Sequence, residues 1–287
     1  MNQDLMLWAA TVRNKSFAER IKAAQAGGFA TMSMFPLDYQ MFTESGTSAA
    51  DMHAVMDESG VKVTVLDPFT KWTPSWEPPA GLGKDDLAFL DVDEAEFFRM
   101  GEALGIESMS VIEPFMNSFP RDTLTESFAT ICDKAAQNGW RVHLEFMPTS
   151  SINSLATAWD IVKGADRHNG GLVFDTWHYF RSDPDDELLK TIPGERIYRV
   201  QVADAKDEIR GGSLNEDLLH YRLPPGEGDF ALKPTLKILN EIGGFSSVGT
   251  ELFSDDFDAM SAEEAGEEAG RGLRNVLADM QLKGRNL

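Results

Sequence analysis

Hydrophobic and polar positions along the chain follow two patterns, one typical of strands and one typical of helices, and segments of the two kinds alternate. Short apolar runs, rich in β-branched residues and bounded by glycine or polar residues, predict buried strands. Longer segments with apolar positions three and four apart predict helices between them. The predicted strands are residues 5–12, 29–35, 61–67, 108–113, 141–146, 172–175, 197–202 and 247–252.

Helix start and stop signals separate these strands. Ser16 and Glu19 have the spacing of a capping box, and the helix that they begin is predicted to end at Gly27 and Gly28. Ser48 and Asp51 repeat the pattern before Gly60. The chain therefore reads as repeated strand–helix units.

Eight such units in 287 residues average about 36 residues each, which is typical of a (β/α)8 TIM barrel. We therefore expect an α/β protein with one barrel domain spanning residues 1–287. A doubly wound open sheet is the alternative, but no G-x-G-x-x-G follows the first strand and no P-loop signature occurs.

A long segment, residues 68–91, follows the third predicted strand. It contains Phe69, Trp72 and Trp76 together with several prolines and glycines, which is too aromatic for a solvated linker. We expect a lid over the rim of the barrel, with Trp72 in contact with substrate. The alternative is an apolar flap packed permanently on the barrel or on a neighbouring subunit.

Composition and charge narrow the class of protein. With 42% hydrophobic and 25% charged residues the chain is an ordinary globular protein, and its net charge of −21 disfavours nucleic acid as a partner. The single cysteine, Cys132, fits a reducing compartment as a small buried residue. Without a signal-like start or 18 consecutive apolar residues, we expect a cytoplasmic protein, neither exported nor membrane-spanning, and compatible with homo-oligomerisation.

Polar residues stand where several predicted strands end. In a barrel, the carboxyl ends of the strands form the active-site face. The residues at or just beyond these ends are Glu113, Glu145, Asp175, Gln201, Asp204 and Glu251. Carboxylates converging on one axis repel one another unless a divalent cation neutralises them. An oxygen-rich set suits Mn²⁺ or Mg²⁺ best, with Co²⁺ or Zn²⁺ as alternatives.

The sixth predicted strand carries the most distinctive chemistry. Asp175 ends it and His178 follows three positions later, among Trp177, Tyr179 and Phe180. A carboxylate and an imidazole at this spacing can hold a metal ion and a substrate at one rim. The simpler reading is an N-capping Asp175 and a half-buried His178 at a helix start.

Five motifs in the second half of the chain carry a resemblance: RVHLEFMP, LVFDTWHYFRS, VQVADA, RLPPGEGDF and GTELFSD. Together they resemble the sugar phosphate isomerase/epimerase group of xylose-isomerase-like TIM barrels. That group includes ketose 3-epimerases, inosose dehydratases and dehydroshikimate dehydratases. The first half resembles the group only in its strand–helix rhythm.

The resemblance implies a role for each matching residue. It implies that Glu145, Asp175, Gln201 and Glu251 bind one divalent metal ion, with Glu145 and Glu251 also acting as the acid/base pair, and that His178 and Arg222 contact substrate. Many members have histidine where this chain has Gln201, so the metal identity stays open. Glu113 is a further candidate for substrate contact, and Asp204 an alternative to Gln201.

Each of these residues also has a structural interpretation. Glu145 and Glu251 can be rim charges, and Gln201 can simply hydrogen-bond a neighbour. Arg222 can pair with Glu227 or Asp229. His143, two positions before Glu145, shares its strand face and is expected to be a satisfied barrel histidine.

The leading functional hypothesis is a metal-dependent isomerase or epimerase of a keto-sugar or related polyhydroxy ketone. It would remove a proton next to the carbonyl and pass through an enediolate. Loss of a β-hydroxyl from the same intermediate would make it a dehydratase, a lyase of an inosose- or dehydroshikimate-like ring. A non-catalytic metal-stabilised binding protein is the alternative of another class. A multi-zinc nuclease is disfavoured because the chain has only five histidines.

Overall fold

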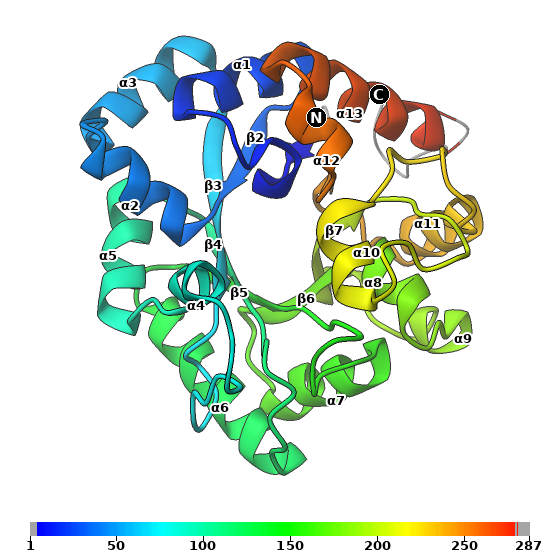
Figure 1. The fold of residues 1–287 in the computed structure, drawn as a ribbon. Helices are drawn as coiled ribbons and strands as arrows, with labels where there is room; N and C mark the ends of the chain where they lie inside the picture. The colour runs from blue at the N-terminus through cyan, green and yellow to red at the C-terminus, as the bar shows by residue number, and fades with distance from the viewer. Residues whose placement is uncertain (1–4, 279, 281–287) are drawn as a thin grey trace.

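Parallel strands close into a barrel at the centre of the fold (Figure 1). The computed structural model describes residues 5–278 and 280. The strands are β1 (Met6–Leu7), β2 (Thr31–Met34), β3 (Lys62–Phe69), β4 (Ser108–Val111), β5 (Arg141–Leu144), β6 (Gly170–Asp175), β7 (Ile197–Val202) and β8 (Val248–Thr250). Each pairs in parallel with the next, and β8 pairs with β1, so the predicted TIM barrel is confirmed.

Helices surround this barrel (Figure 1). They are α1 (Phe17–Gly27), α2 (Pro36–Glu44), α3 (Ala49–Ser59), α4 (Lys84–Leu90), α5 (Glu94–Leu104), α6 (Arg121–Ala136), α7 (Leu155–Ala165), α8 (Thr176–Arg181), α9 (Asp186–Leu189), α10 (Leu214–His220), α11 (Leu232–Ile242), α12 (Asp255–Ala259) and α13 (Ala262–Leu277), with short 3₁₀ helices η1 (Ala9–Val12) and η2 (Gly194–Arg196). The predicted capping boxes at Ser16 and Ser48 are both present. Cys132 is buried in α6.

The first strand is shorter than predicted. The pattern in residues 5–12 predicted one strand, but β1 ends at Leu7 and η1 follows. The backbone N–H of Ala9 donates to Ser33 Oγ at 2.8 Å, and that of Thr11 donates to the carbonyl of Trp8. These bonds turn the chain out of the ladder, so apolar character alone overstated the length of the strand.

Side chains inside the barrel form their own cluster, separate from the main core between barrel and helices. Met6, Trp8, Val65 and Val173 pack together, while Leu7, between Met6 and Trp8, packs in the main core. Alternate residues of a strand point to opposite faces. Asp67 and Asp175, each two positions beyond an interior valine, therefore also face into the barrel, at the carboxyl ends of β3 and β6.

The segment after β3 differs from the predicted tryptophan lid. Trp72 is only 5% exposed, and its indole N–H donates to the carbonyl of Ile112 at 2.8 Å. Its ring packs edge-on against Phe128 of α6, in the main core outside the barrel. Trp76 is held similarly, by a hydrogen bond to Thr70 Oγ1. The expectation that Trp72 contacts substrate is therefore not carried further, because the ring is used in packing.

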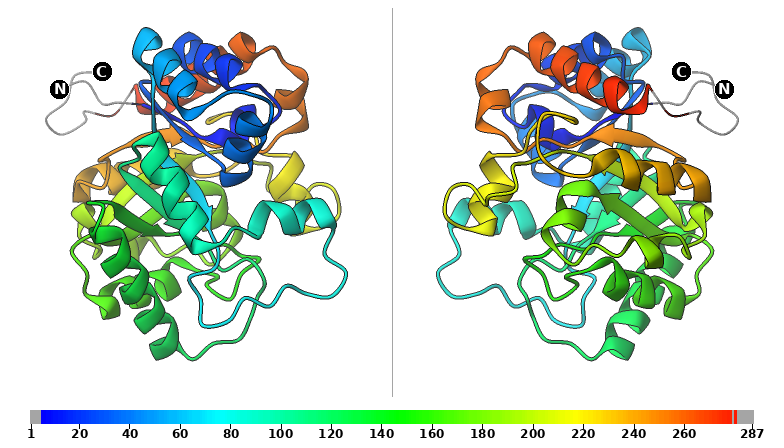
Figure 2. Two further views of the ribbon diagram at one scale, coloured as in Figure 1. Left: turned by 90° about the vertical axis from the view of Figure 1, so that its left-hand side faces the viewer. Right: turned by 90° about the vertical axis from the view of Figure 1, so that its right-hand side faces the viewer.

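The part of this segment that does reach the barrel mouth is α4, which lies at the same end as α10 (Figure 2). Phe89 of α4 packs edge-on against Phe35, which follows β2, with ring centroids 4.9 Å apart. Phe35 stacks in turn with Phe253, which follows β8, at 6.2 Å. These three rings, with Ala9 and Ala10 of η1, form the mouth cluster, a small apolar cluster separate from the main core.

The first and last helices meet at very close range. A Cβ on Gly266 of α13 would lie 1.9 Å from the carbonyl oxygen of Ala23 in α1, and one on Gly270 would lie 2.2 Å from that of Gly27. Only glycine lets the two backbones approach so closely. The guanidinium of Arg274 then donates to the carbonyl of Gly27. This α1–α13 contact lies beside the junction of β1 and β8 and completes the ring (Figure 1).

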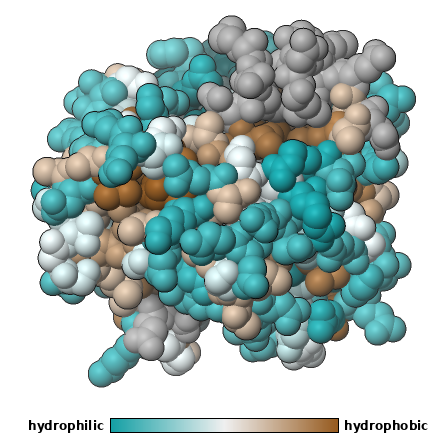
Figure 3. Space-filling model, turned by 90° about the horizontal axis from the view of Figure 1, so that it is seen from above, coloured by the Kyte–Doolittle hydropathy of each residue, from teal (hydrophilic) through white to brown (hydrophobic). Residues whose placement is uncertain are grey.

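Hydrophilic residues predominate on the face seen in Figure 3, with smaller hydrophobic areas between them. Within the described part of the chain, none of the helices combines the length and the apolar character that crossing a bilayer requires.

Candidate functional site

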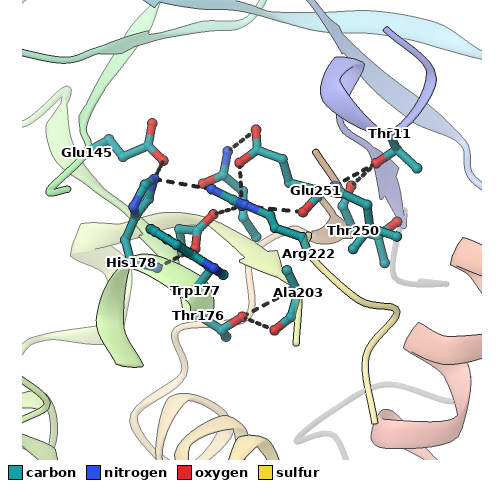
Figure 4. A network of polar contacts seen from close by, with 12 residues as sticks. Thr11, Glu145, Thr176, Trp177, His178, Ala203, Arg222, Thr250 and Glu251 are labelled. Atoms are coloured by element: carbon teal, nitrogen blue, oxygen red, sulfur yellow. Dashed lines mark hydrogen bonds and ion pairs between the residues drawn. The ribbon is translucent and has the colours of Figure 1, made fainter. Parts of the chain in front are cut away.

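Four of the predicted residues come together inside the barrel, at the ends of β5 to β8. Glu145 directly follows β5, Asp175 ends β6, Gln201 lies in β7 and Glu251 directly follows β8. All four are buried, from fully enclosed Asp175 and Gln201 to 6% exposed Glu145. The parallel strands bring together residues that are more than 100 positions apart in the chain (Figure 4).

Arg222 lies in the middle of this group. Its backbone is fixed between the ends of β7 and β8, because Arg222 N–H donates to the carbonyl of Phe253 and Leu223 exchanges backbone bonds with Asp204. Its Nη1 lies 2.7 Å from Asp175 Oδ2 and 3.1 Å from Glu251 Oε2. Arg222 is therefore a partner of the strand-end carboxylates rather than of Glu227 or Asp229.

Aromatic rings enclose the same guanidinium. It lies 5.2 Å from the ring centre of Trp177 and 5.3 Å from that of Phe253. Such cation–π contacts are strongest where water is excluded, and Arg222 is fully buried. The arginine is thus held by backbone, carboxylates and rings together.

Asp175 is the predicted N-cap, and His178 is buried rather than half-buried. Asp175 Oδ1 accepts the backbone N–H of His178 at 2.8 Å and so caps α8, while Oδ2 faces Arg222. The ring of His178 is carried back into the barrel, with Nε2 3.3 Å from Glu145 Oε1 and 3.4 Å from Arg222 Nη2. The cap therefore positions the histidine over the carboxylates (Figure 4).

Gln201 has a carbonyl oxygen inside the barrel that is unpaired within the described part of the chain. Its Nε2 donates to Glu251 Oε1 at 2.9 Å, which leaves Oε1 of the amide buried and without a hydrogen-bond partner among the described residues. An unpaired buried carbonyl oxygen is costly unless a cation or a donor reaches it. The donor set thus fits a divalent ion that prefers oxygen ligands.

A second grouping overlaps with the predicted one. One ligand atom each from Glu145, Asp175 and His178 lies within 4.8 Å of the other two, a spacing that a single metal ion can bridge. This grouping includes the histidine that the motif resemblance assigns to substrate. The geometry therefore supports a divalent site at this rim and leaves its fourth ligand open.

The electrostatic environment shifts the pKa values of Glu251 and Asp175 in opposite directions. Burial raises the pKa of Glu251 well above its usual range, although Arg222 opposes this effect. Burial acts in the same direction on Asp175, but Arg222, His178 and the hydrogen bonds to its carboxylate outweigh it and hold its pKa below the usual value. Neighbouring acids with opposed pKa shifts are characteristic of sites that move protons.

Asp67 is a member of this site that our reading of the sequence missed. It is buried at the carboxyl end of β3, where burial and then the charge of Glu145 raise its pKa to about 8. Ser110 hydrogen-bonds its carboxyl group and lies 3.1 Å from His143 Nδ1. The signal was present, since the third predicted strand ended at Asp67, and the strand-end rule should have included it.

Two other candidates have structural roles instead. Glu113 Oε1 accepts the backbone N–H of Phe115, and its Oε2 accepts the N–H and hydroxyl of Ser151, so it ties together the loops after β4 and β5. Asp204 accepts the backbone N–H groups of Ala205, Gly226 and Phe230 and holds the loop after β7. Loop backbone groups, and for Glu113 the Ser151 hydroxyl, bind these carboxylates, and a substrate contact of Glu113 or a metal contact of Asp204 stays a prediction.

Comparison with known proteins adds the family context. A family model described as "Xylose isomerase-like TIM barrel" matches residues 21–276. The 3-dehydroshikimate dehydratase of Pseudomonas aeruginosa is 27% identical over 262 residues, which cover 90% of this chain but 39% of that protein. The inosose isomerase of Bacillus subtilis is 33% identical over 159 residues, covering 55% of this chain and 54% of the relative.

One solved structure matches this chain over almost the full length of both proteins. The crystal structure of the IOLI protein with a binding zinc atom superposes with a TM-score of 0.82, covering 96% of this chain and 98% of that one. At 22% identity this likeness shows the shared fold. The chain spans about two fifths to half the length of the two curated relatives named above.

Proposed function

Because the chain belongs to the xylose isomerase-like TIM barrel family, we propose that it is a divalent-metal-dependent isomerase or epimerase of a small polyhydroxy ketone. The observation that carries this proposal is the group Glu145, Asp175 and Glu251 around one buried rim, with the unpartnered Oε1 of Gln201 beside it. The two curated relatives are by name an isomerase and a dehydratase, which supports an enzymatic role.

We propose Glu145, Asp175, Gln201 and Glu251 as the residues that would hold the metal ion. A divalent ion bound there would act as a Lewis acid that stabilises negative charge on the substrate carbonyl oxygen. Its identity is open between Mn²⁺, Mg²⁺, Co²⁺ and Zn²⁺, since the set is rich in oxygen and His178 lies within reach.

Side chains of the protein would transfer the proton. Glu145 and Glu251 follow β5 and β8, so they approach the barrel axis from different sides. One carboxylate takes the proton next to the carbonyl, and the other returns it to the opposite face of the enediolate. His178 and Arg222 orient the substrate oxygens, and burial of the rim excludes water from the reaction.

The charges around the rim favour a neutral substrate. Arg222 is paired with Asp175 and Glu251, Arg181 with Asp217, and Arg13 with Asp258. A substrate carboxylate or phosphate that bound one of these three arginines would have to break its ion pair. A keto-sugar or an inosose-like cyclic polyol ketone meets no such conflict.

A dehydratase is the second candidate, favoured by the 90% of this chain that aligns with the 3-dehydroshikimate dehydratase. The same proton abstraction then ends with loss of a β-hydroxyl instead of return of the proton. The two candidates differ in product and share the same catalytic carboxylates.

Solvent deuterium incorporation tests the proposal. Protein loaded with Mn²⁺, Mg²⁺, Co²⁺ or Zn²⁺ is incubated in deuterated water with ketoses, inososes and cyclic hydroxy-ketones. We expect deuterium next to the carbonyl of one substrate class, and its loss in Glu145→Gln and Glu251→Gln but not in Glu227→Gln, an exposed control. Absence of both exchange and dehydration with every metal and substrate would refute an enzymatic function of this class.

Metal content tests the ligand set separately. Asp175→Asn and Glu251→Gln should each retain clearly less metal than the wild-type protein after dialysis, measured by elemental analysis. His178→Ala should retain metal and lose substrate affinity. If His178→Ala lost its metal and kept its substrate affinity, His178 would be a metal ligand, and one of the other four residues would not be.

A further inference from the structure

Arg222 occupies an unusual position for a residue whose expected partner is substrate. Its Nη1 alone contacts both Asp175 Oδ2, at 2.7 Å, and Glu251 Oε2, at 3.1 Å. It also lies 3.3 Å from the backbone carbonyl of Glu251. One nitrogen of the guanidinium thus sits between two of the proposed ligands, where Figure 4 shows it reaching across the rim.

A buried cation at this point has a clear electrostatic purpose. Asp175 is fully buried and Glu251 is 3% exposed, so neither carboxylate is solvated by bulk water. Close, desolvated carboxylates repel strongly, and an uncompensated buried charge is severely destabilising. The guanidinium supplies a compensating charge from within the chain.

The same contact restricts Glu251 as a ligand. Its Oε2 is engaged by Arg222, and its Oε1 accepts the amide of Gln201. Among the described residues, the group whose ligand atoms lie within 4.8 Å of one another consists of Glu145, Asp175 and His178, and it does not include Glu251. Arg222 thus stands between Glu251 and that group.

We propose that the guanidinium of Arg222 competes with the metal ion for the position between the carboxylates of Asp175 and Glu251. A divalent ion recruits Glu251 fully only when the guanidinium moves aside. The inference rests on the proposed metal-dependent function, and it assigns Arg222 a role in setting metal affinity in addition to any contact with substrate. In the position seen here, the rings of Trp177 and Phe253 flank the guanidinium and stabilise its charge.

Calorimetric titration of metal-stripped protein with Zn²⁺ and with Mn²⁺ tests this competition without any substrate. We expect Arg222→Gln to bind the ion about tenfold more tightly than the wild-type protein or better, because the competing charge is gone. Arg13→Gln is the matched control. Arg13 lies over the same Phe253 ring at 5.7 Å and pairs with Asp258, outside the ligand group, so its loss should change affinity less than threefold.

The competition also predicts a dependence on Glu251. In Glu251→Gln protein, the further change Arg222→Gln should tighten binding much less than it does in wild-type protein, because the contested ligand is absent. If Arg222→Gln proves too unstable without metal, Arg222→Lys, which keeps the charge on a differently shaped donor, is titrated in its place. Arg222→Lys should bind the ion at least threefold more tightly than the wild-type protein, and equal or weaker binding overturns the proposal.

Unchanged or weaker binding in Arg222→Gln, or equal tightening in Arg13→Gln, overturns the proposal. If that result accompanies deuterium exchange in the wild-type protein, the competition fails while the proposed function stands. Tighter binding by Arg222→Gln in a protein without exchange or dehydration supports the competition and refutes the enzymatic function. The two failures are therefore distinguishable.

Discussion

Replacing Asp67 by asparagine should make the metal-free protein more stable at alkaline pH. Asp67 is buried at the end of β3, and burial followed by the charge of Glu145 raises its pKa from 3.8 to about 8. A group whose pKa is raised on folding stabilises the fold fully below its unfolded pKa. That contribution is lost as pH rises through the folded pKa, here from about pH 4 to about pH 8.

The size of the effect follows from the shift. One pKa unit corresponds to about 1.4 kcal/mol, so a shift from 3.8 to about 8 sets an upper limit of roughly 6 kcal/mol above pH 8. Asparagine keeps the shape of the protonated acid and cannot ionise. If a third of this limit is realised, about 2 kcal/mol, Tm should rise by roughly 4 to 8 °C in a protein of this size.

Thermal unfolding followed by circular dichroism in EDTA, at pH 5 and at pH 9, measures this difference. The variant should unfold at a higher temperature than the wild-type protein at pH 9, and the difference should be clearly smaller at pH 5. Asp183→Asn, at an exposed position, is the control and should follow the wild-type protein at both pH values. An equal difference at the two pH values would refute the argument from ionisation.

Three further predictions concern the supports of the site. Glu113→Ala should lower Tm by several degrees without changing metal affinity in calorimetric titration, because it frees the loops after β4 and β5. Gly266→Ala should lower the free energy of unfolding by about 1 to 3 kcal/mol in urea, since its Cβ would lie 1.9 Å from the carbonyl oxygen of Ala23. Phe89→Ala should lower kcat/KM in the exchange assay and leave metal content unchanged, because it opens the mouth cluster but touches no carboxylate; a loss of metal would contradict that placement.

The barrel was predictable because its signals are local and repeated. The strand at residues 197–202 was predicted to the residue, and the Ser16 and Ser48 capping boxes formed as expected. Each of these features depends on residues within a few positions of one another. The short helices α2 and α10 lack the length that gives a clear period and were not predicted.

The site was predictable only in part, and for a physical reason. The strand-end rule brought Glu145, Asp175 and Glu251 to one rim, because parallel strands fix which ends meet. Contacts made by long side chains follow no such rule. Trp72 donates to a carbonyl 40 positions later, and Arg222 donates to Asp175 across 47 positions. Neither contact can be predicted from the neighbouring sequence.

The contact between the first and last helices has a consequence for how a newly made chain reaches this structure. Arg274 and Gly27 bond across 247 positions, and Met6 of β1 pairs with Gly249 of β8, so both contacts need almost the whole chain. During synthesis on the ribosome, the unpaired side of β1 stays open until nearly the whole chain has emerged, and open strand edges invite association between nascent chains. We therefore expect damage at the glycines of this contact to show first as aggregation during expression and a greater need for chaperones, and only then as altered catalysis.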